Sequence, residues 1–103
     1  MNQLVLTLYS RKGCCLCEGL EQKLRSLSFD RLTPPTKLLV VDMDGEGVDE
    51  SERLRYDLEV PVLVLRSFEI NQSFELPRVS PRLKEEGLFR WLQKTINKSL
   101  DCD

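Results

Sequence analysis

The sequence predicts an α/β domain in which a mixed four-stranded sheet carries helices on both faces. Short apolar runs are typical of strands, and longer segments with apolar residues three and four apart are typical of helices. Together they occur in the order β-α-β-α-β-β-α. At 103 residues, the chain is long enough for one such domain, and we expect residues 1–103 to form it.

The first predicted strand is Leu4–Tyr9, a short run that is nearly all apolar. A basic turn, Arg11–Gly13, follows it, and a helix is predicted from Cys14 to about Ser28. Leucines spaced four and three residues apart form the apolar stripe of this helix. Gly19 is a weak point, because glycine costs up to ~1 kcal/mol relative to alanine inside a helix. The stripe consists of Leu16, Leu20, Leu24 and Leu27.

A loop over Asp30–Thr36 leads to the second predicted strand, Lys37–Met43. Its consecutive apolar residues predict a second buried strand. Strand, helix and strand at this spacing form a βαβ unit, so we expect these two strands to be parallel. A short second helix is predicted from about Asp49 to Leu58, with Leu54 and Leu58 facing inward.

The third predicted strand, Val62–Arg66, follows Val60-Pro61. A turn near Ser67–Glu69 and a fourth strand near Ile70–Leu76 are close enough to the third strand for an antiparallel hairpin. The last helix is predicted from Arg82 or Leu83 to Leu100. Its apolar stripe consists of Leu88, Trp91, Leu92, Thr95 and Ile96.

The composition argues against several classes of function. A net charge of −2 gives no reason to expect nucleic acid or an anionic membrane as a partner. The chain has no histidine, which removes imidazole-based catalysis and the commonest metal ligand. Met1–Gln3 and the short run after it do not resemble a signal peptide, and no run reaches membrane-spanning length. We therefore expect a cytoplasmic protein, in which cysteines are more often catalytic or metal-binding than structural.

The cysteines of the first helix are the main candidates for chemistry. Cys14 and Cys17 have C-x-x-C spacing, which places their α-carbons roughly 5 Å apart on one helical face, within reach of a disulfide. If Cys14 begins the helix, the dipole and the free amides of the first turn favour its thiolate. Arg11 and Lys12 would add to this effect and could hold a substrate carboxylate, or they form a solvated turn. We predict a dithiol/disulfide redox site.

Other interpretations of the cysteines stay open. Cys14 and Cys17 could be inert packing residues, although their spacing and position favour redox chemistry. A zinc site needs four ligands, and Cys15 would point about 100° away from Cys14 in an ideal helix, so we expect no metal. Cys15 is a packing residue or a competitor of Cys17 for a mixed disulfide. We expect Cys102 to be an exposed thiol without a role.

Two segments, Leu6–Cys17 and Tyr56–Leu63, resemble the thioredoxin-like superfamily. The resemblance is strongest to the glutaredoxin-like branch of small bacterial proteins, and it covers about Leu4 to Leu92. It implies a thioredoxin-like fold with strand order 2-1-3-4 and a fourth strand antiparallel to the third. It also implies a thiol–disulfide oxidoreductase that acts on protein or small-molecule disulfides.

The resemblance assigns roles to individual residues. It implies that Cys14 is the exposed nucleophile and that Cys17 is the partly buried resolving thiol. It also implies a cis peptide bond between Val60 and Pro61, beside the dithiol. Such a bond would leave the backbone groups of Val60 free to pair with substrate. Together with the basic turn considered above, this makes Arg11, Lys12, Val60 and Pro61 the expected substrate-binding residues.

The chain departs from the glutaredoxin pattern in two segments. Cys15-Leu16 stands where Pro-Tyr is usual, and Glu75–Val79 lacks the Gly-Gly turn that helps to bind glutathione. The acidic residue that caps the amino group of glutathione is not identifiable there either. We expect no bound cofactor, a disulfide substrate on a protein or linked to glutathione, and a monomer. Glutathione and a thioredoxin-type reductase are both candidate reductants.

Two alternatives belong to other functional classes. One is an arsenate-reductase-like enzyme on the same fold, in which Cys14 attacks an oxyanion and Arg66 or Arg78 lies near the sulfur. The other is a non-enzymatic module that docks a partner strand at Val60-Pro61 and uses its cysteines for redox sensing or metal binding.

Overall fold

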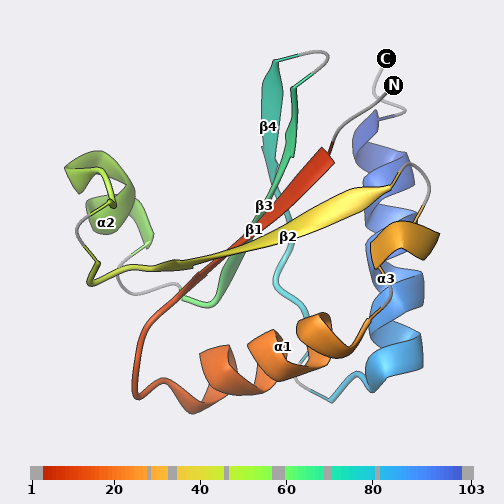
Figure 1. The fold of residues 1–103 in the computed structure, drawn as a ribbon, viewed down its shortest axis with the longest axis horizontal. Coiled ribbons are helices and arrows are strands. Elements are labelled where there is room, and N and C mark those ends of the chain that lie inside the picture. Colours follow the sequence, from red (N-terminus) through yellow and green to blue (C-terminus); the bar gives the residue numbers. More distant parts are fainter. Residues whose placement is uncertain are drawn as a thin grey trace.

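The structure, a computed structural model, describes residues 4–27, 29–32, 35–45, 47–56, 60–68, 71–80 and 82–100 (Figure 1). Its strands and helices follow the predicted order, with one short 3₁₀ helix, η1, added before the second strand. The elements are β1 (Leu4–Ser10), α1 (Cys15–Ser26), η1 (Phe29–Arg31), β2 (Thr36–Asp42), α2 (Glu50–Tyr56), β3 (Val62–Ser67), β4 (Gln72–Glu75) and α3 (Glu85–Leu100).

The strands form one mixed four-stranded sheet in the order β2-β1-β3-β4, which confirms the expected topology. β1 is parallel to β2, with Leu6 opposite Leu38. β3 is antiparallel to both of its neighbours, with Leu65 opposite Leu6 on one side and Phe74 on the other. The central position of β1 matters for the site, because the cysteines directly follow this strand.

Alternation along the strands gives the sheet two different faces. On one face, Leu4, Leu6 and Leu8 of β1 pack in a core cluster with buried leucines of α1 and α3. On the other face, Tyr9 packs in a second cluster with Tyr56 of α2. Helices therefore cover both faces, as predicted, and Figure 1 shows α1 and α3 together on one side with α2 apart from them.

The apolar stripe of α1 differs from the prediction at its start. Leu20 and Leu24 are buried, but Leu16 is 55% exposed and Cys17 is fully buried in its place. Seven residues correspond to nearly two full turns, so Cys17 lies within about 20° of Leu24, whereas Leu16 lies about 80° away. The inward position at the start of α1 therefore belongs to a cysteine.

The prediction that β2 is a buried strand is wrong at Leu39. Leu39 is 52% exposed, and Leu38 and Val40 are only partly buried against the larger cluster. β2 is an edge strand, so one of its sides has no neighbouring strand. On the face that carries Leu39, the second cluster reaches only as far as Val41. The apolar run in the sequence therefore overstates the burial of this strand.

Helix α2 faces its core differently from the prediction. Leu54, expected to face inward, is 76% exposed, and Leu58 lies outside the described residues. Tyr56 is the buried residue, and its ring centroid lies 4.9 Å from that of Tyr9. Residues two apart in a helix point about 200° apart, so burial of Tyr56 turns Leu54 toward solvent.

The predicted stripe of α3 is largely confirmed. Leu88, Leu92 and Ile96 are buried, while Trp91 and Thr95 are half-buried at the margin of the stripe. Thr95 Oγ1 donates a hydrogen bond to the Trp91 carbonyl oxygen at 2.7 Å. Among the described residues, no helix is long and apolar enough to cross a membrane.

Candidate thiol site

A tight turn delivers the cysteines from the sheet to α1. Gly13 has a φ of +83°, a backbone conformation that residues other than glycine adopt only at a cost in free energy. The Cys14 amide donates to the Arg11 carbonyl oxygen at 3.2 Å, which closes the turn. Cys14 then adopts an extended backbone, with φ of −91° and ψ of 107°, and serves as the N-cap of α1. The expectation that Cys14 begins the helix is confirmed.

The sulfur of Cys14 takes the place of the usual capping oxygen. Its Sγ atom accepts a hydrogen bond from the Cys17 backbone N–H at 3.2 Å. Serine, threonine, aspartate and asparagine normally supply this interaction, because the first amides of a helix have no partner within it. The positive end of the helix dipole favours an anion at this position. Cys14 is half-buried, so this residue lies at the helix end with part of its surface exposed to solvent.

Cys17 has the opposite environment. Its side chain is fully buried. The pKa of the Cys17 thiol is raised from 9.0 to about 11. Burial is the largest cause of this rise in pKa; the hydrogen bond with the Cys14 side chain adds to it, and a hydrogen bond with the Arg11 backbone partly opposes it. Both cysteines are free thiols. The pair therefore consists of one half-buried cysteine and one buried thiol that holds its proton.

The basic turn before Cys14 is fastened to the end of β2. Arg11 Nε lies 3.2 Å from Asp44 Oδ2, with the two side chains 29% and 59% exposed. The Asp44 amide in turn donates to Asp42 Oδ1 at 3.0 Å. The structure thus gives Arg11 a carboxylate partner that the sequence analysis missed, while Lys12 is exposed. The pairing follows from the β1–β2 register, which places Ser10 opposite Asp42.

The bond between Val60 and Pro61 is cis, as expected. The expectation that the backbone of Val60 is free is wrong for its amide, because that N–H donates to the Tyr56 carbonyl oxygen at 3.2 Å. Pro61 lies opposite α1 and lines a pocket together with Cys15. The structure therefore brings the proline to the cysteine segment, as the sequence-based interpretation requires.

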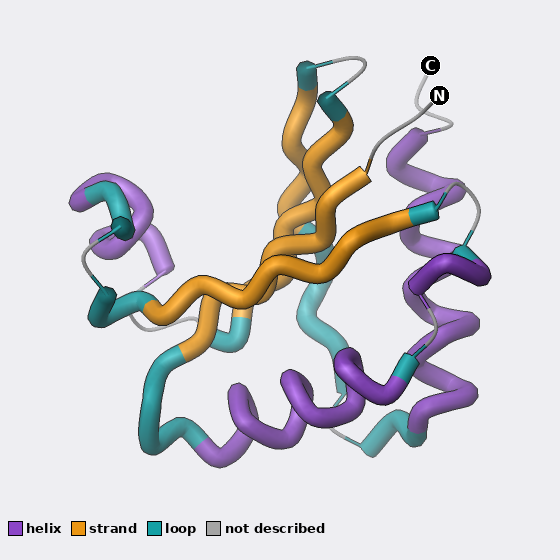
Figure 2. The backbone as a smooth tube through the Cα atoms, viewed as in Figure 1, coloured by secondary structure: helices purple, strands orange, loops and turns teal. Residues whose placement is uncertain are grey.

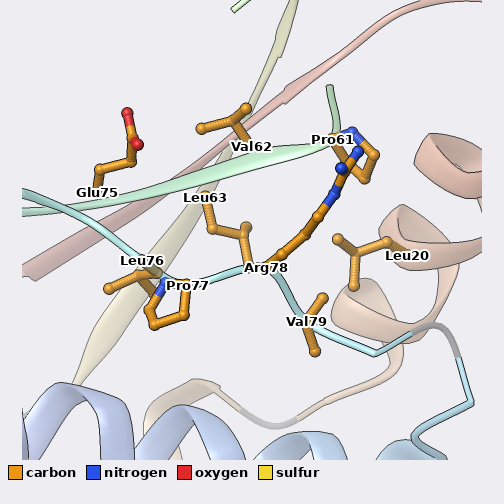
Figure 3. A pocket seen from close by; sticks show the side chains of 9 residues that line it. All are labelled: Leu20, Pro61, Val62, Leu63, Glu75, Leu76, Pro77, Arg78 and Val79. Atoms are coloured by element: carbon orange, nitrogen blue, oxygen red, sulfur yellow. The ribbon is translucent and has the colours of Figure 1, made fainter. Parts of the chain in front are cut away.

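Two pockets meet at Pro61. The first has a volume of about 260 Å³ and lies between the start of β3 and the segment after β4 (Figure 3). In Figure 3, the long side chain of Arg78 extends toward Pro61 beside Leu20. The second pocket, of about 250 Å³, shares Leu20, Pro61, Arg78 and Val79 with the first and continues to Cys15. Arg78 thus lies between two hollows next to the thiol segment.

The second candidate arginine lies elsewhere. Arg66 lies on β3, four residues after Val62, the first residue of the strand. Four residues of a strand span roughly 13 Å, so Arg66 lies about that far from the end of β3 next to Pro61. Its Nε donates to Ser73 Oγ on β4 at 3.3 Å. Of the two arginines suggested for an oxyanion site, only Arg78 lines the pockets beside Pro61.

The three cysteines of this segment have different surroundings. Cys14 caps α1, Cys15 is exposed and lines the second pocket, and Cys17 is buried. Within the described part of the chain, no group of three histidine, cysteine, aspartate or glutamate residues is arranged to hold a metal ion. Cys102 lies outside the described residues.

Comparison with known proteins gives a consistent result. A family described as Glutaredoxin-like domain (DUF836) matches residues 5–93, which include both Cys14 and Pro61. No curated protein matches the chain. A solved structure described as "Structure of a malarial protein" is similar in fold, with a TM-score of 0.59 and 18% sequence identity. The similarity covers 91% of this chain and 98% of that one.

Proposed function

Since the chain belongs to the glutaredoxin-like family and has a thioredoxin-like fold, we propose that it is a thiol–disulfide oxidoreductase. Cys14 is the nucleophile and Cys17 the resolving thiol. The observation that carries the proposal is the contrast within one helical turn: a half-buried cysteine whose sulfur accepts a hydrogen bond from the Cys17 amide, and a fully buried partner cysteine. Disulfide exchange needs such a pair, because one thiol must reach the substrate and the other must release it.

In the first step, the Cys14 thiolate attacks one sulfur of the substrate disulfide. A new S–S bond joins Cys14 to that sulfur, the substrate S–S bond breaks, and the other substrate sulfur leaves as a thiolate that takes up a proton from water. The N-terminus of α1 favours the attacking anion, since the Cys17 amide already points at the Cys14 sulfur.

In the second step, Cys17 attacks Cys14 Sγ. With a pKa of about 11, roughly one Cys17 thiol in ten thousand is ionised at pH 7. The departing substrate sulfur therefore receives the Cys17 proton as the mixed disulfide breaks and the Cys14–Cys17 disulfide forms. Two electrons pass from the dithiol to the substrate. A reductant, glutathione or a thioredoxin-type reductase, returns them in a reverse exchange.

The remaining roles follow the same scheme. The protein acts as a cytoplasmic monomer without a bound cofactor, on a disulfide that belongs to a protein or is linked to glutathione. Pro61 forms the wall opposite the cysteine segment, and the Val60 carbonyl pairs with the substrate backbone. Lys12, which is exposed at the turn, and Arg11, which Asp44 engages, attract a substrate carboxylate.

A redox titration tests the proposal. The protein is equilibrated in graded glutathione buffers and trapped with acid, and the state of each cysteine is read by peptide mass spectrometry. We expect a reversible Cys14–Cys17 disulfide at a potential between about −270 and −200 mV, the span of thioredoxins and glutaredoxins. If both thiols stay reduced throughout, the proposal fails and a non-enzymatic binding module takes its place. A dominant glutathione adduct on Cys14 indicates a monothiol mechanism instead.

One observation favours a second candidate, an arsenate-reductase-like enzyme. Arg78 lines the pocket that Cys15 and Pro61 also line, so an oxyanion in this pocket would have a cation close by. Arginine suits such a ligand because its planar fork binds oxyanions through two parallel hydrogen bonds. Arsenate-dependent oxidation of the dithiol, lost in Arg78→Gln and retained in Arg66→Gln, would support this candidate over disulfide reduction.

A further inference from the structure

Helix α2 packs on the sheet through a single buried side chain. Figure 2 shows α2 at one end of the sheet, apart from α1 and α3. The structure describes every residue of α2, and Tyr56 is the one that is buried. Its ring centroid lies 4.9 Å from that of Tyr9, with an angle of 33° between the ring planes. Aromatic rings at this separation attract each other beyond the area that they bury. Tyr56 therefore fixes the end of α2 to β1, the strand that leads to the cysteines.

The two tyrosines hold both chain neighbours of Pro61. The carbonyl oxygen of Tyr56 accepts a hydrogen bond from the Val60 N–H at 3.2 Å, and Val60 packs against the second cluster, which contains both tyrosine rings. On the other side of the proline, Val62 is buried in the same cluster and lies opposite Tyr9 in the β1–β3 register. The backbone is therefore fixed immediately before and immediately after Pro61.

Pro61 itself belongs to the other side of the sheet. It lines both pockets beside α1 together with Leu20, and the second pocket also includes Cys15. The second cluster lies on the opposite face, away from the core cluster that α1 and α3 form with the sheet. The proline that faces the cysteine segment is thus supported from behind by a cluster that does not contact this segment through any described cysteine.

We propose that Tyr56 is a positioning residue for polypeptide disulfides. It acts through Val60 and Pro61, which the proposed function assigns to the substrate, and it touches neither the substrate nor the reacting sulfurs. The inference rests on the proposed function, and it adds the residue that holds the substrate-pairing backbone and the class of substrate that depends on it. A small disulfide has no peptide backbone to pair with Val60. Only a polypeptide substrate therefore loses binding when this backbone is displaced.

The ring of Tyr56, rather than its hydroxyl, provides this support. Burial raises the pKa of Tyr56, and the carboxylate of Glu75 raises it further, so the hydroxyl stays protonated near that carboxylate. Glu75 also forms an ion pair with Arg55 at 3.4 Å, in which the two side chains are 40% and 67% exposed. Such exposed contacts contribute little to stability. Removal of the hydroxyl should therefore leave the ring pair with Tyr9 and the hydrogen bond to Val60 in place.

The experiment compares two mixed disulfides that share one leaving group. One joins thionitrobenzoate to the cysteine of a synthetic peptide, and the other joins it to 2-mercaptoethanol. Cys14 bonds to the peptide or mercaptoethanol sulfur, and thionitrobenzoate leaves as a coloured thiolate. A single turnover of the reduced protein is followed at increasing substrate concentration, which gives the maximal rate and the half-saturating concentration. The rate of Cys14→Ser, which reports the other thiols, is subtracted.

Tyr56→Ala should raise the half-saturating concentration of the peptide disulfide about tenfold and change its maximal rate less than about twofold, because binding is lost and the thiol chemistry is not. The rate with the mercaptoethanol disulfide should also change less than about twofold. Tyr56→Phe should restore the wild-type values. The matched control is Met43→Ala, which removes another buried side chain of the second cluster and should leave both substrates unaffected. Urea unfolding shows that each variant is folded in the assay, and Tyr56→Leu, with the same expected loss, replaces an unfolded Tyr56→Ala.

The possible results separate the two proposals. A folded Tyr56→Ala or Tyr56→Leu protein with the wild-type half-saturating concentration would overturn the positioning role and leave the oxidoreductase in place. Equal losses for the peptide and the mercaptoethanol disulfide would do the same, and so would an equal loss in Met43→Ala, because each would indicate a general loosening of the fold. If the wild-type protein releases no more thionitrobenzoate than Cys14→Ser does, the proposed function itself is wrong.

Discussion

The backbone N–H of Cys17 donates a hydrogen bond to the sulfur of Cys14 at 3.2 Å. The residue that supplies the buried thiol thus also supplies, through its peptide group, the donor that holds the exposed sulfur at the helix end. These two contributions can be separated by substitution, because changing the Cys17 side chain leaves its amide in place. The capping contact depends instead on the Cys14 side chain.

Substitution of Cys17 by serine is therefore expected to trap the first intermediate. Cys17→Ser retains the amide that contacts Cys14 Sγ but lacks the thiol that resolves the mixed disulfide. We expect stoichiometric accumulation of a mixed disulfide on Cys14 when the variant meets a disulfide substrate. Intact-mass spectrometry under acid trapping measures this accumulation.

Two further variants control that experiment. Cys14→Ser should form no mixed disulfide at this site and should lose essentially all turnover. Cys15→Ser, which changes an exposed thiol, should trap nothing and should keep turnover with a small disulfide. A mixed disulfide on Cys15 in the Cys17→Ser protein would show that the nucleophile has been assigned to the wrong residue.

The raised pKa of Cys17 predicts how stability depends on pH. Below pH 9 the thiol is protonated in both the folded and the unfolded chain, and its full contribution is present. Above pH 9 the unfolded chain ionises while the folded protein keeps the proton until about pH 11, so stability falls as pH rises through this window. A rise of about two pKa units corresponds to a loss of about 2–3 kcal/mol in the free energy of unfolding.

Urea unfolding of the reduced protein between pH 8 and 11 measures this loss. Burial also raises the pKa of Tyr9 and Tyr56, so the wild-type protein is compared with Cys17→Ala, in which the tyrosines are unchanged. The difference in unfolding free energy between the two proteins should shrink as pH rises from 9 to 11. A difference that stays constant across this range would contradict the assignment of Cys17 as a buried protonated thiol.

Glycine-to-alanine substitutions should affect stability differently at three positions, which differ in the space available to a Cβ atom and in backbone φ. Gly19→Ala should raise the free energy of unfolding by about 0.4–1 kcal/mol, because its Cβ has open space and alanine favours the helix. Gly87→Ala in α3 should gain less, since its Cβ would lie 3.1 Å from Leu83 Cδ2. Gly13→Ala should be destabilising by about 1 kcal/mol, because its φ is +83°. Chemical denaturation ranks the three variants, and a loss of stability in Gly19→Ala would contradict the open space at that position.

Leucines of similar appearance in the sequence should respond differently to truncation. Leu92 is fully buried between α3 and the sheet, so Leu92→Ala should cost about 2–5 kcal/mol. Leu54 is 76% exposed, and Leu54→Ala should change the free energy of unfolding by no more than about 0.5 kcal/mol. Equal losses for the two variants in denaturant titrations would mean that the orientation of α2 is wrong.

The ion pair between Arg11 and Asp44 should contribute little to stability. Both side chains are substantially exposed, at 29% and 59%, so solvent and salt screen the interaction. Asp44→Asn should therefore lower the free energy of unfolding by less than about 1 kcal/mol, and 0.5 M salt should remove most of the difference. The comparison requires only thermal melts of two proteins at two salt concentrations.

Local patterns were sufficient for the order of elements. Short apolar runs identified the strands and helical spacings of leucine identified the helices, while the C-x-x-C spacing identified the pair of cysteines that the fold places at the start of α1. Resemblance to a family added the strand order and the cis bond before Pro61, which no local pattern of the chain contains. The pattern failed at Leu16, Leu39 and Leu54, where the apolar character of a residue did not match its exposure.

The sequence by itself determined the elements, their order and the residues capable of thiol chemistry, because backbone periodicity and cysteine spacing act over a few residues. Only the tertiary structure decided which thiol is buried, where Arg78 lies and what surrounds Gly19. Those properties depend on segments that are distant in the chain. The segment after β2 meets the turn before α1, and Pro61 and the segment after β4 meet α1 itself, only when the sheet has formed. The burial of the site and the charge around it arise from these distant segments together. The spacing of residues along the chain therefore does not predict them.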